Sequence, residues 1–152
     1  MGTVAAPRLP IASDRSGSVT AGVGQLAGFD DRPVAWFHGA VGAPDAPVVE
    51  RTIRAGIDNG IPVVGVIERS GLDANAGLAG LAGLGRVAAA LVAASGVVPT
   101  ALVLDGPCLG GPAVAAGLAD LVVMTRRATM FVNRPETTAR MTGTNHLDPQ
   151  EL

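Results

Sequence analysis

The chain has 152 residues, of which 48% are hydrophobic, so we expect one domain with a single hydrophobic core. The formal net charge is −2, the chain has only three Phe and one Trp, and its 11 basic residues are all Arg. These features disfavour a nucleic-acid binder and exclude chemistry that needs a reactive Lys. With one Cys and no secretory leader pattern, we expect a reducing, cytoplasmic environment.

The N-terminal part of the chain predicts an arm followed by a hairpin. Residues 1–17 show no hydrophobic period and contain two prolines, so we expect a flexible arm. Residues 18–29 alternate, the turn DDRP follows, and VAWFHG then continues the alternation. We therefore expect two antiparallel strands.

The middle of the chain alternates helical and strand-like segments. Residues 48–58 have helical spacing and end at Asn59-Gly60, a typical helix stop. IPVVGVI, residues 61–67, predicts a buried strand, and residues 78–94 predict a helix with an apolar face. PTALVLD, residues 99–105, predicts the next buried strand.

The last part of the chain continues this alternation. The predicted elements are a short helix over residues 112–118, a buried strand over 121–124, a strand over 129–132 and a helix that starts with Pro135. Strands that alternate with crossover helices indicate an α/β fold with an at least partly parallel sheet.

One apolar run is long enough to span a bilayer. It extends from Leu78 to Leu104, but Arg86 lies inside it and Ser95, Gly96 and Pro99 interrupt it. A central Arg costs about 2.5–3.5 kcal/mol in a membrane. We therefore interpret the run as two buried elements and expect no membrane partner.

The stretch DGPCLGGP, residues 105–112, places the only cysteine in a glycine turn between a strand and a helix. Together with LADLVVM, MFVNRPE and TGTNHLDPQEL further on, it resembles the carboxyltransferase β subunits of biotin-dependent acyl-CoA carboxylases. The likeness covers roughly residues 18–152 and matches the N-terminal half of that family, which belongs to the crotonase superfamily.

The resemblance implies a crotonase-like ββα superhelix, truncated relative to a full domain, over residues 18–152. It also implies carboxyl transfer from carboxybiotin on a biotin carrier protein to an acyl-CoA. This reaction places negative charge on an enolate oxygen and on the ureido oxygen of biotin, and backbone N–H groups stabilise such charges. The family uses two glycine-rich loops for this purpose and no obligatory nucleophile, and we expect no metal site in this chain.

The resemblance also assigns site residues. Backbone donors are expected at Gly110 and Gly111 in one loop, and at Ser70 and Gly71 in the other. The residues expected to contact the substrate are Leu72, Cys108, Leu109, Pro112 and His38.

The chain departs from the family pattern at several points. Pro112 has no N–H where the family has a small residue that can donate, and one glycine of the pair near Gly71 is replaced by Leu72. Each family protomer has two halves and builds its site with a neighbour. We therefore expect this chain to form a homo- or hetero-oligomer with a carboxyltransferase partner half.

Other functions fit parts of the pattern. The main alternative is a non-catalytic assembly or scaffold subunit, and a third is a partner in biotin-independent malonyl decarboxylation, which needs the same enolate stabilisation. A crotonase-type hydratase is disfavoured because Val114 stands where one of its two glutamates would be. A nucleophilic Cys108 would need a base, but His38 and His146 have no supporting motif, so a small buried thiol is favoured.

Overall fold

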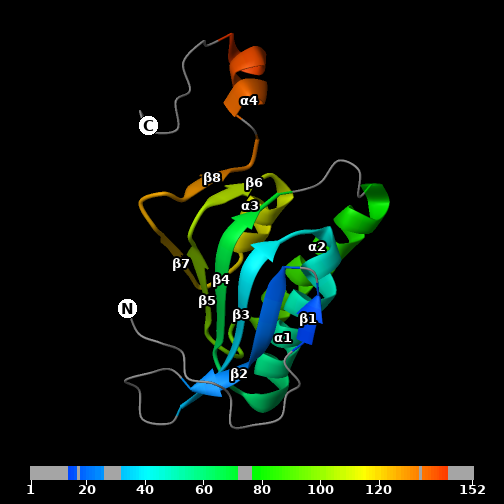
Figure 1. Ribbon diagram of the computed structural model, residues 1–152, viewed down its shortest axis with the longest axis vertical. Helices are drawn as coiled ribbons and strands as arrows, with labels where there is room; N and C mark the ends of the chain where they lie inside the picture. Colours follow the sequence, from blue (N-terminus) through cyan, green and yellow to red (C-terminus); the bar gives the residue numbers. More distant parts are fainter. Residues whose placement is uncertain (1–13, 17, 26–31, 72–76, 134, 144–152) are drawn as a thin grey trace.

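In the computed structural model, residues 14–16, 18–25, 32–71, 77–133 and 135–143 are described. They form a mixed β-sheet with helices packed against one of its faces (Figure 1). The main strands lie in the order β1-β2-β3-β4-β5-β7, while β6 pairs with β4 and with β8. This arrangement confirms the predicted α/β class and the partly parallel sheet.

The N-terminal strands are antiparallel. They are β1 (Asp14–Ser16), β2 (Val19–Gln25) and β3 (Pro33–Val41). The pairing of β2 with β3 confirms the predicted hairpin. The prediction of an arm over residues 1–17 is wrong for Asp14–Ser16, because their backbone pairs with β2. The other residues of that arm lie outside the described residues.

The parallel part of the sheet follows the predicted alternation. A 3-10 turn, η1 (Ala43–Asp45), leads into α1 (Ala46–Asn59), which ends at Gly60 in the left-handed conformation at φ 62°. The chain then forms β4 (Val63–Ser70), α2 (Gly77–Ala94) and β5 (Thr100–Leu104). β3, β4 and β5 are parallel neighbours, as crossover helices require.

The last part of the chain forms three short strands and two helices. They are β6 (Pro107–Leu109), α3 (Gly111–Ala116), β7 (Leu121–Met124), β8 (Thr129–Phe131) and α4 (Pro135–Thr142). β7 completes the main sheet, while β6 and β8 pair with each other. β6 was not predicted, because its three residues are within the glycine-rich turn. The predicted helix start at Pro135 is confirmed, and Figure 1 shows α4 standing apart from the sheet.

The core depends on close packing of backbone against large side chains. Phe37, Gly65 and Leu102 are aligned across β3, β4 and β5. A Cβ on Gly65 would overlap the Phe37 ring and would lie 2.6 Å from Leu102 Cδ2. The glycine therefore makes room for a ring that packs flat on the sheet beneath the helices.

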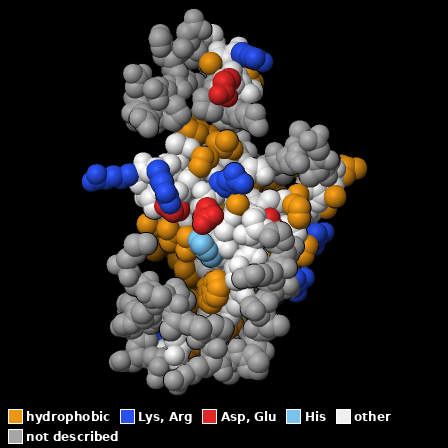
Figure 2. Space-filling view, viewed as in Figure 1, with side chains coloured by type: hydrophobic (Ala, Val, Ile, Leu, Met, Phe, Trp, Pro, Cys, Tyr) orange, Lys and Arg blue, Asp and Glu red, His pale blue; other side chains and the backbone are white. Residues whose placement is uncertain are grey.

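Two segments expected to be buried are partly exposed. The side chains of Leu121 and Val123 on β7 are 55% and 45% exposed, because β7 is the last strand of the main sheet. Figure 2 shows apolar side chains gathered on this side of the molecule.

Helix α2 is the second such segment. It buries Gly80, Gly83 and Leu91, whereas Leu78 is 84% exposed. By length and composition alone α2 could cross a membrane, which is weak evidence for a single helix. The chain leaves α2 at Ala94 and starts β5 at Thr100, so the predicted division of the apolar run is confirmed.

A hydrogen-bonded clamp joins the starts of β5 and β7. Asp120 Oδ2 accepts hydrogen bonds from the Thr100 backbone N–H at 2.7 Å and from the Thr100 hydroxyl at 2.8 Å. The Asp120 N–H donates to Thr100 Oγ1 at 3.0 Å. These bonds lower the pKa of Asp120, and the bond from the Thr100 backbone N–H has the largest effect. Asp120 thus organises the start of β7 against the start of β5.

Replacing Gly65 with Ala is expected to lower the free energy of unfolding by about 1–3 kcal/mol, because the added methyl overpacks the Phe37 contact. Urea denaturation measures the change. Gly85→Ala is the matched control: Gly85 is exposed on α2, and a Cβ there meets nothing within 4 Å. That control is expected to be neutral or stabilising by up to about 1 kcal/mol. Equal stability of the two variants would contradict the packing argument.

Asp120→Asn is expected to make stability less sensitive to acid. A carboxylate whose pKa is lowered by folding stabilises the fold above its unfolded pKa of about 3.9 and loses this contribution as the pH falls through the folded value. Urea unfolding between pH 2.5 and 6 should therefore show a shallower acid loss in the variant. Asp58→Asn, which removes an exposed carboxylate outside the clamp, should keep the steeper loss.

Candidate functional site

The two predicted loops meet where β4 extends beyond β5. β4 pairs with β5 as far as Ile67 and then, three residues later, pairs with β6 through Ser70 and Cys108. Ser70 Oγ lies 3.2 Å from Cys108 Sγ, and both residues are buried. The structure therefore brings together two segments that are 38 residues apart in the sequence.

The turn between β5 and β6 needs a glycine for this meeting. A Cβ on Gly106 would overlap the carbonyl oxygen of Glu68 on β4. Any larger residue would push β6 away from the end of β4. Gly106 thus sets the distance between the two loops.

The glycines before α3 have different roles. Gly110 has φ 74° and donates its N–H to the Phe131 carbonyl at 2.8 Å. This bond uses the only N–H of Gly110 to complete the β6–β8 connection, and the role of Gly110 as an oxyanion donor stays a prediction. Gly111 is the first residue of α3, where an N–H has no partner within the helix, and Pro112 has no N–H.

An apolar cavity of about 60 Å³ lies between the helices and the sheet beside this meeting point. Its deep wall includes Phe37, Ile53 and Leu91, and its edge includes Ser70, Gly71 and Pro112. Gly80 on α2 and Ala115 on α3 also line it. Small side chains at these two positions leave space that larger ones would fill.

A wider and more polar cleft adjoins this cavity. Arg69, Pro107 and Asp45 are among its lining residues. The residues that line both the cleft and the apolar cavity are Val41, Gly42, Ala43, Ser70 and Gly71. The cavity and the cleft therefore share an edge that contains one predicted donor loop.

The start of α1 contributes a part of this site that was not predicted from the sequence. Asp45 is 4% exposed, and its Oδ2 accepts a hydrogen bond from the Gly42 N–H at 2.9 Å. The available signal was the stretch GAPDAP, in which an acidic residue between two prolines indicates a structured helix entry. The only sequence signal that Arg69 lines the cleft was its position next to the predicted donor Ser70.

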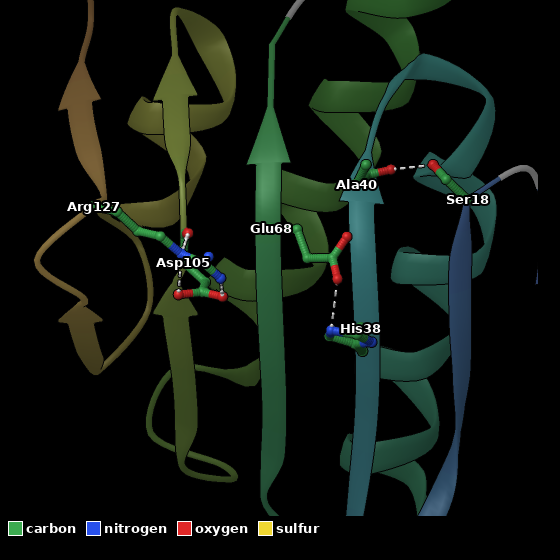
Figure 3. A network of polar contacts seen from close by, with 6 residues as sticks. All are labelled: Ser18, His38, Ala40, Glu68, Asp105 and Arg127. Carbon is green, nitrogen blue, oxygen red and sulfur yellow. Dashed lines mark hydrogen bonds and ion pairs between the residues drawn. The ribbon is translucent and has the colours of Figure 1, made fainter.

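The remaining predicted contact residues divide into three cases. Leu109 is half-buried on β6 beside Cys108. Leu72 lies outside the described residues. His38 does not line the cavity or the cleft, because it is on the face of the sheet opposite α1 and α2, which we call the helix-free face (Figure 3). The prediction that His38 contacts substrate in the cleft is therefore not supported.

The helix-free face carries a polar network at the carboxyl ends of the strands. His38 Nε2 lies 3.2 Å from Glu68 Oε1, and both side chains are about half exposed. Asp105 pairs with Arg127, whose Nε also donates to the Asp105 carbonyl at 2.8 Å. Figure 3 shows the two pairs side by side in front of the sheet. The hydrogen bond from Arg127 is the main cause that lowers the pKa of Asp105.

Cys108 has the environment of a structural thiol. Its side chain is 0% exposed, and burial raises the pKa of the thiol, an effect that the Ser70 hydrogen bond partly offsets. A raised pKa reduces the thiolate fraction at neutral pH. Among the described residues, no group of three or more His, Cys, Asp or Glu side chains could hold a metal ion.

The partly parallel sheet, the helix layer on one face and the short β6–β8 pair next to the end of β4 define a crotonase-like α/β protein. The family of carboxyl transferase domains matches residues 9–152, and the chain belongs to this family. This finding confirms the resemblance seen in the sequence.

Two curated relatives illustrate the similarity. The methylmalonyl-CoA carboxyltransferase 12S subunit of Propionibacterium freudenreichii subsp. shermanii is 31% identical over 105 residues, which are 69% of this chain and 20% of that subunit. The propionyl-CoA carboxylase beta chain of Cereibacter sphaeroides is 32% identical over 107 residues, which are 70% of this chain and 21% of that one. The aligned region thus amounts to about a fifth of each relative.

Solved structures agree with the fold. Transcarboxylase 12S, determined with methylmalonyl-CoA bound, superposes with a TM-score of 0.79 at 29% identity over 88% of this chain and 27% of that chain. A Pseudomonas malonate decarboxylase hetero-dimer superposes with a TM-score of 0.68 at 22% identity over 91% of this chain and 67% of that chain. The second similarity concerns the fold alone.

Cys108 is expected to react with iodoacetamide about 100-fold more slowly in the folded chain than in urea, because the buried thiol must be exposed before it reacts. Mass spectrometry of quenched samples at pH 7.5 follows the labelling. A Cys108→Ala/Ser95→Cys chain, with its thiol on the exposed Ser95 site, provides the accessible control. Equal rates for native Cys108 and this control would contradict a structural role.

Proposed function

We propose that this chain is an acyl-CoA carboxyltransferase-like subunit that binds an acyl thioester and stabilises its enolate. The observation that carries the proposal is the meeting of Ser70-Gly71 with the Cys108–Gly111 turn at the edge shared by a polar cleft and an apolar cavity. An acyl-CoA thioester is also polar on one side and apolar on the other, since its carbonyl joins the polar coenzyme A arm to an aliphatic acyl group.

Backbone N–H groups are the proposed catalytic groups. Gly111 contributes the first N–H of α3, and Ser70 and Gly71 contribute the second loop. An N–H aimed at a developing oxyanion stabilises the transition state by about 2.7–4 kcal/mol. Arg69 in the cleft would attract the anionic parts of coenzyme A. Carboxybiotin on a carrier protein would supply the carboxyl group.

The proposal includes partner chains. The transcarboxylase 12S structure is described as a hexamer, and the malonate decarboxylase structure is a hetero-dimer. Because both structures are assemblies of several chains, we propose that a carboxyltransferase partner half completes the site. A biotin carrier protein is the proposed donor, and the cytoplasm is the proposed compartment.

Calorimetric titration with acetyl-, propionyl- and malonyl-CoA tests substrate binding. The chain is titrated alone and after co-purification with chains that carry a carboxyltransferase C-terminal half. Saturable binding of at least one thioester, with weaker binding of free coenzyme A, is the expected result. Failure of every thioester in every combination would refute the proposed function.

Gly111→Pro tests the backbone donor in the assembled enzyme. Proline is tolerated at the first position of a helix but has no N–H, so the variant removes the donor. Because Pro112 follows and disfavours a helical residue before it, circular dichroism checks that the fold is retained. We expect carboxyl transfer or malonyl-CoA decarboxylation to fall about 100- to 1000-fold. Gly111→Ala keeps the N–H and should retain more turnover than the proline variant.

The alternative is a non-catalytic assembly subunit. Two observations favour it: Pro112 has no N–H, and Gly110 uses its own N–H on Phe131. Only one donor therefore remains at the start of α3. If Gly111→Pro assembles normally and still loses turnover, the scaffold hypothesis fails. If turnover is unchanged, the catalytic hypothesis fails.

A further inference from the structure

We infer that the outer edge of β7, where the main sheet ends, pairs antiparallel with β7 of a second copy of this chain. The two sheets then form one continuous sheet across a two-fold axis. The inference does not depend on the proposed function, because no residue of β7 lines the cavity or the cleft.

The two edges of the main sheet differ in how they are protected against pairing with another chain. The first edge strand, β1, has the short sequence DRS, with a charge at each of its first two positions. Short length and charge are common features of protected edge strands. The last strand, β7, has the sequence LVVM, and its register with β5 is unbroken. Within the described part of the chain only β5 pairs with β7, so its other edge is unprotected.

The outer edge of β7 is apolar on both faces of the sheet. Val122 packs against the core on the helix side, and Leu121 and Val123 alternate with it. Leu121 and Val123 therefore lie on the helix-free face, where both are exposed. Met124, on the helix side, is 46% exposed. A strand added at this edge would cover apolar side chains on both faces.

The backbone of β7 presents hydrogen-bonding groups along the same edge. The Thr125 N–H donates to the Leu104 carbonyl on β5 at 3.0 Å. Successive residues of a strand direct their N–H and C=O groups to opposite sides, so Val122 and Met124 direct theirs away from β5. An antiparallel pair centred on Val123 places Val122 of one copy opposite Met124 of the other. These two residues then exchange both of their N–H···O=C bonds.

Charged residues at the two ends of β7 favour this register. Asp120 precedes the strand, Arg126 follows it, and both are exposed. Thr100 occupies Oδ2 of Asp120, and Arg126 takes part in none of the ion pairs found among the described residues. The register centred on Val123 places Asp120 of each copy opposite Arg126 of the other. A parallel pair would place like charges together, which is destabilising. The charges therefore favour a second copy in the antiparallel direction.

A cysteine cross-link in the full chain tests the register. In an antiparallel pair without hydrogen bonds the two Cα atoms lie about 4.5 Å apart, which a disulfide can span. A Cys108→Ala/Val123→Cys chain should therefore form a covalent dimer when copper phenanthroline and oxygen oxidise the two thiols. In Cys108→Ala/Leu121→Cys the thiols are offset by about 13 Å and should stay unlinked. Equal cross-linking of the two chains, or none in the first, would overturn the inference.

Sedimentation velocity between about 1 and 100 µM measures the dimer itself. Val123→Lys places two like charges at the two-fold axis and should abolish the dimer. Val92→Lys makes the same change at an exposed position of α2 and should preserve it. A chain that stays monomeric over this range, or a dimer that only Val92→Lys abolishes, would contradict the inference. Circular dichroism checks both folds, and if Val123→Lys does not fold, the next variant replaces it.

Arg126→Asp tests the charge pairs by changing an exposed side chain. Two attractive pairs become repulsive, so the dissociation constant of the dimer should rise about 10-fold at low salt. Arg140→Asp makes the same change on an exposed position of α4 and should leave the dissociation constant unchanged. Equal constants for the two variants would refute the predicted register.

A strand from a carboxyltransferase partner half is the competing occupant of this edge. If the chain alone is monomeric and Val123→Lys prevents its co-purification with that half, β7 pairs with the partner half and the inference is overturned. The thioester titration tests the proposed function separately, so failure of the dimer leaves that function intact.

Discussion

The pairing of Ser70 with Cys108 is the constraint on which the rest of the site depends. β4 runs beside β5 for five residue pairs and then, at Ser70, changes its neighbour to β6. The change is possible because Gly106 allows the β5–β6 turn to lie against the Glu68 carbonyl. One glycine therefore brings the Ser70-Gly71 loop next to the turn that starts α3. Without this close approach, the two loops would be separate features of the surface.

Small residues serve two opposite purposes in this chain. At Gly65 and Gly83 the missing side chain allows tight contact, in the first case with the Phe37 ring and in the second with α1. At Gly80 and Ala115 small side chains leave a hollow instead. The difference depends on what lies opposite each residue, since packing energy comes from atoms in contact and a gap too small for water has no partner atoms. The same composition thus produces both the dense core and the cavity.

Most elements could be predicted because local physics specifies them. The alternation on both sides of the DDRP turn in residues 18–39 led to the hairpin, Gly60 ended α1, and Pro135 began α4. β6 could not be predicted, because three residues inside a glycine turn carry no period of their own. The burial of β7 was overestimated, because an apolar strand pattern does not tell whether a neighbouring strand covers it.

The site was only partly predictable for a related reason. The glycine loop and its family resemblance pointed to Gly111 and Ser70, but the same pattern also selected Gly110 and His38. The bond from the Gly110 N–H to Phe131, 21 residues later, could not be predicted from the loop itself. His38 lies on the helix-free face because it alternates with the buried Phe37 along β3, and the loop motifs do not specify which face of the sheet the helices cover.

The sequence by itself determined the α/β alternation, the family and the small-residue character of the core, since these follow from periods, turn residues and motifs along the chain. Only the tertiary structure decided which N–H groups remain unpaired, which face carries the His38–Glu68 pair, and where the cavity lies. These properties depend on contacts between residues far apart in the sequence. Hydrogen-bond partners and empty volume are properties of two or more segments at once, and no single segment encodes them.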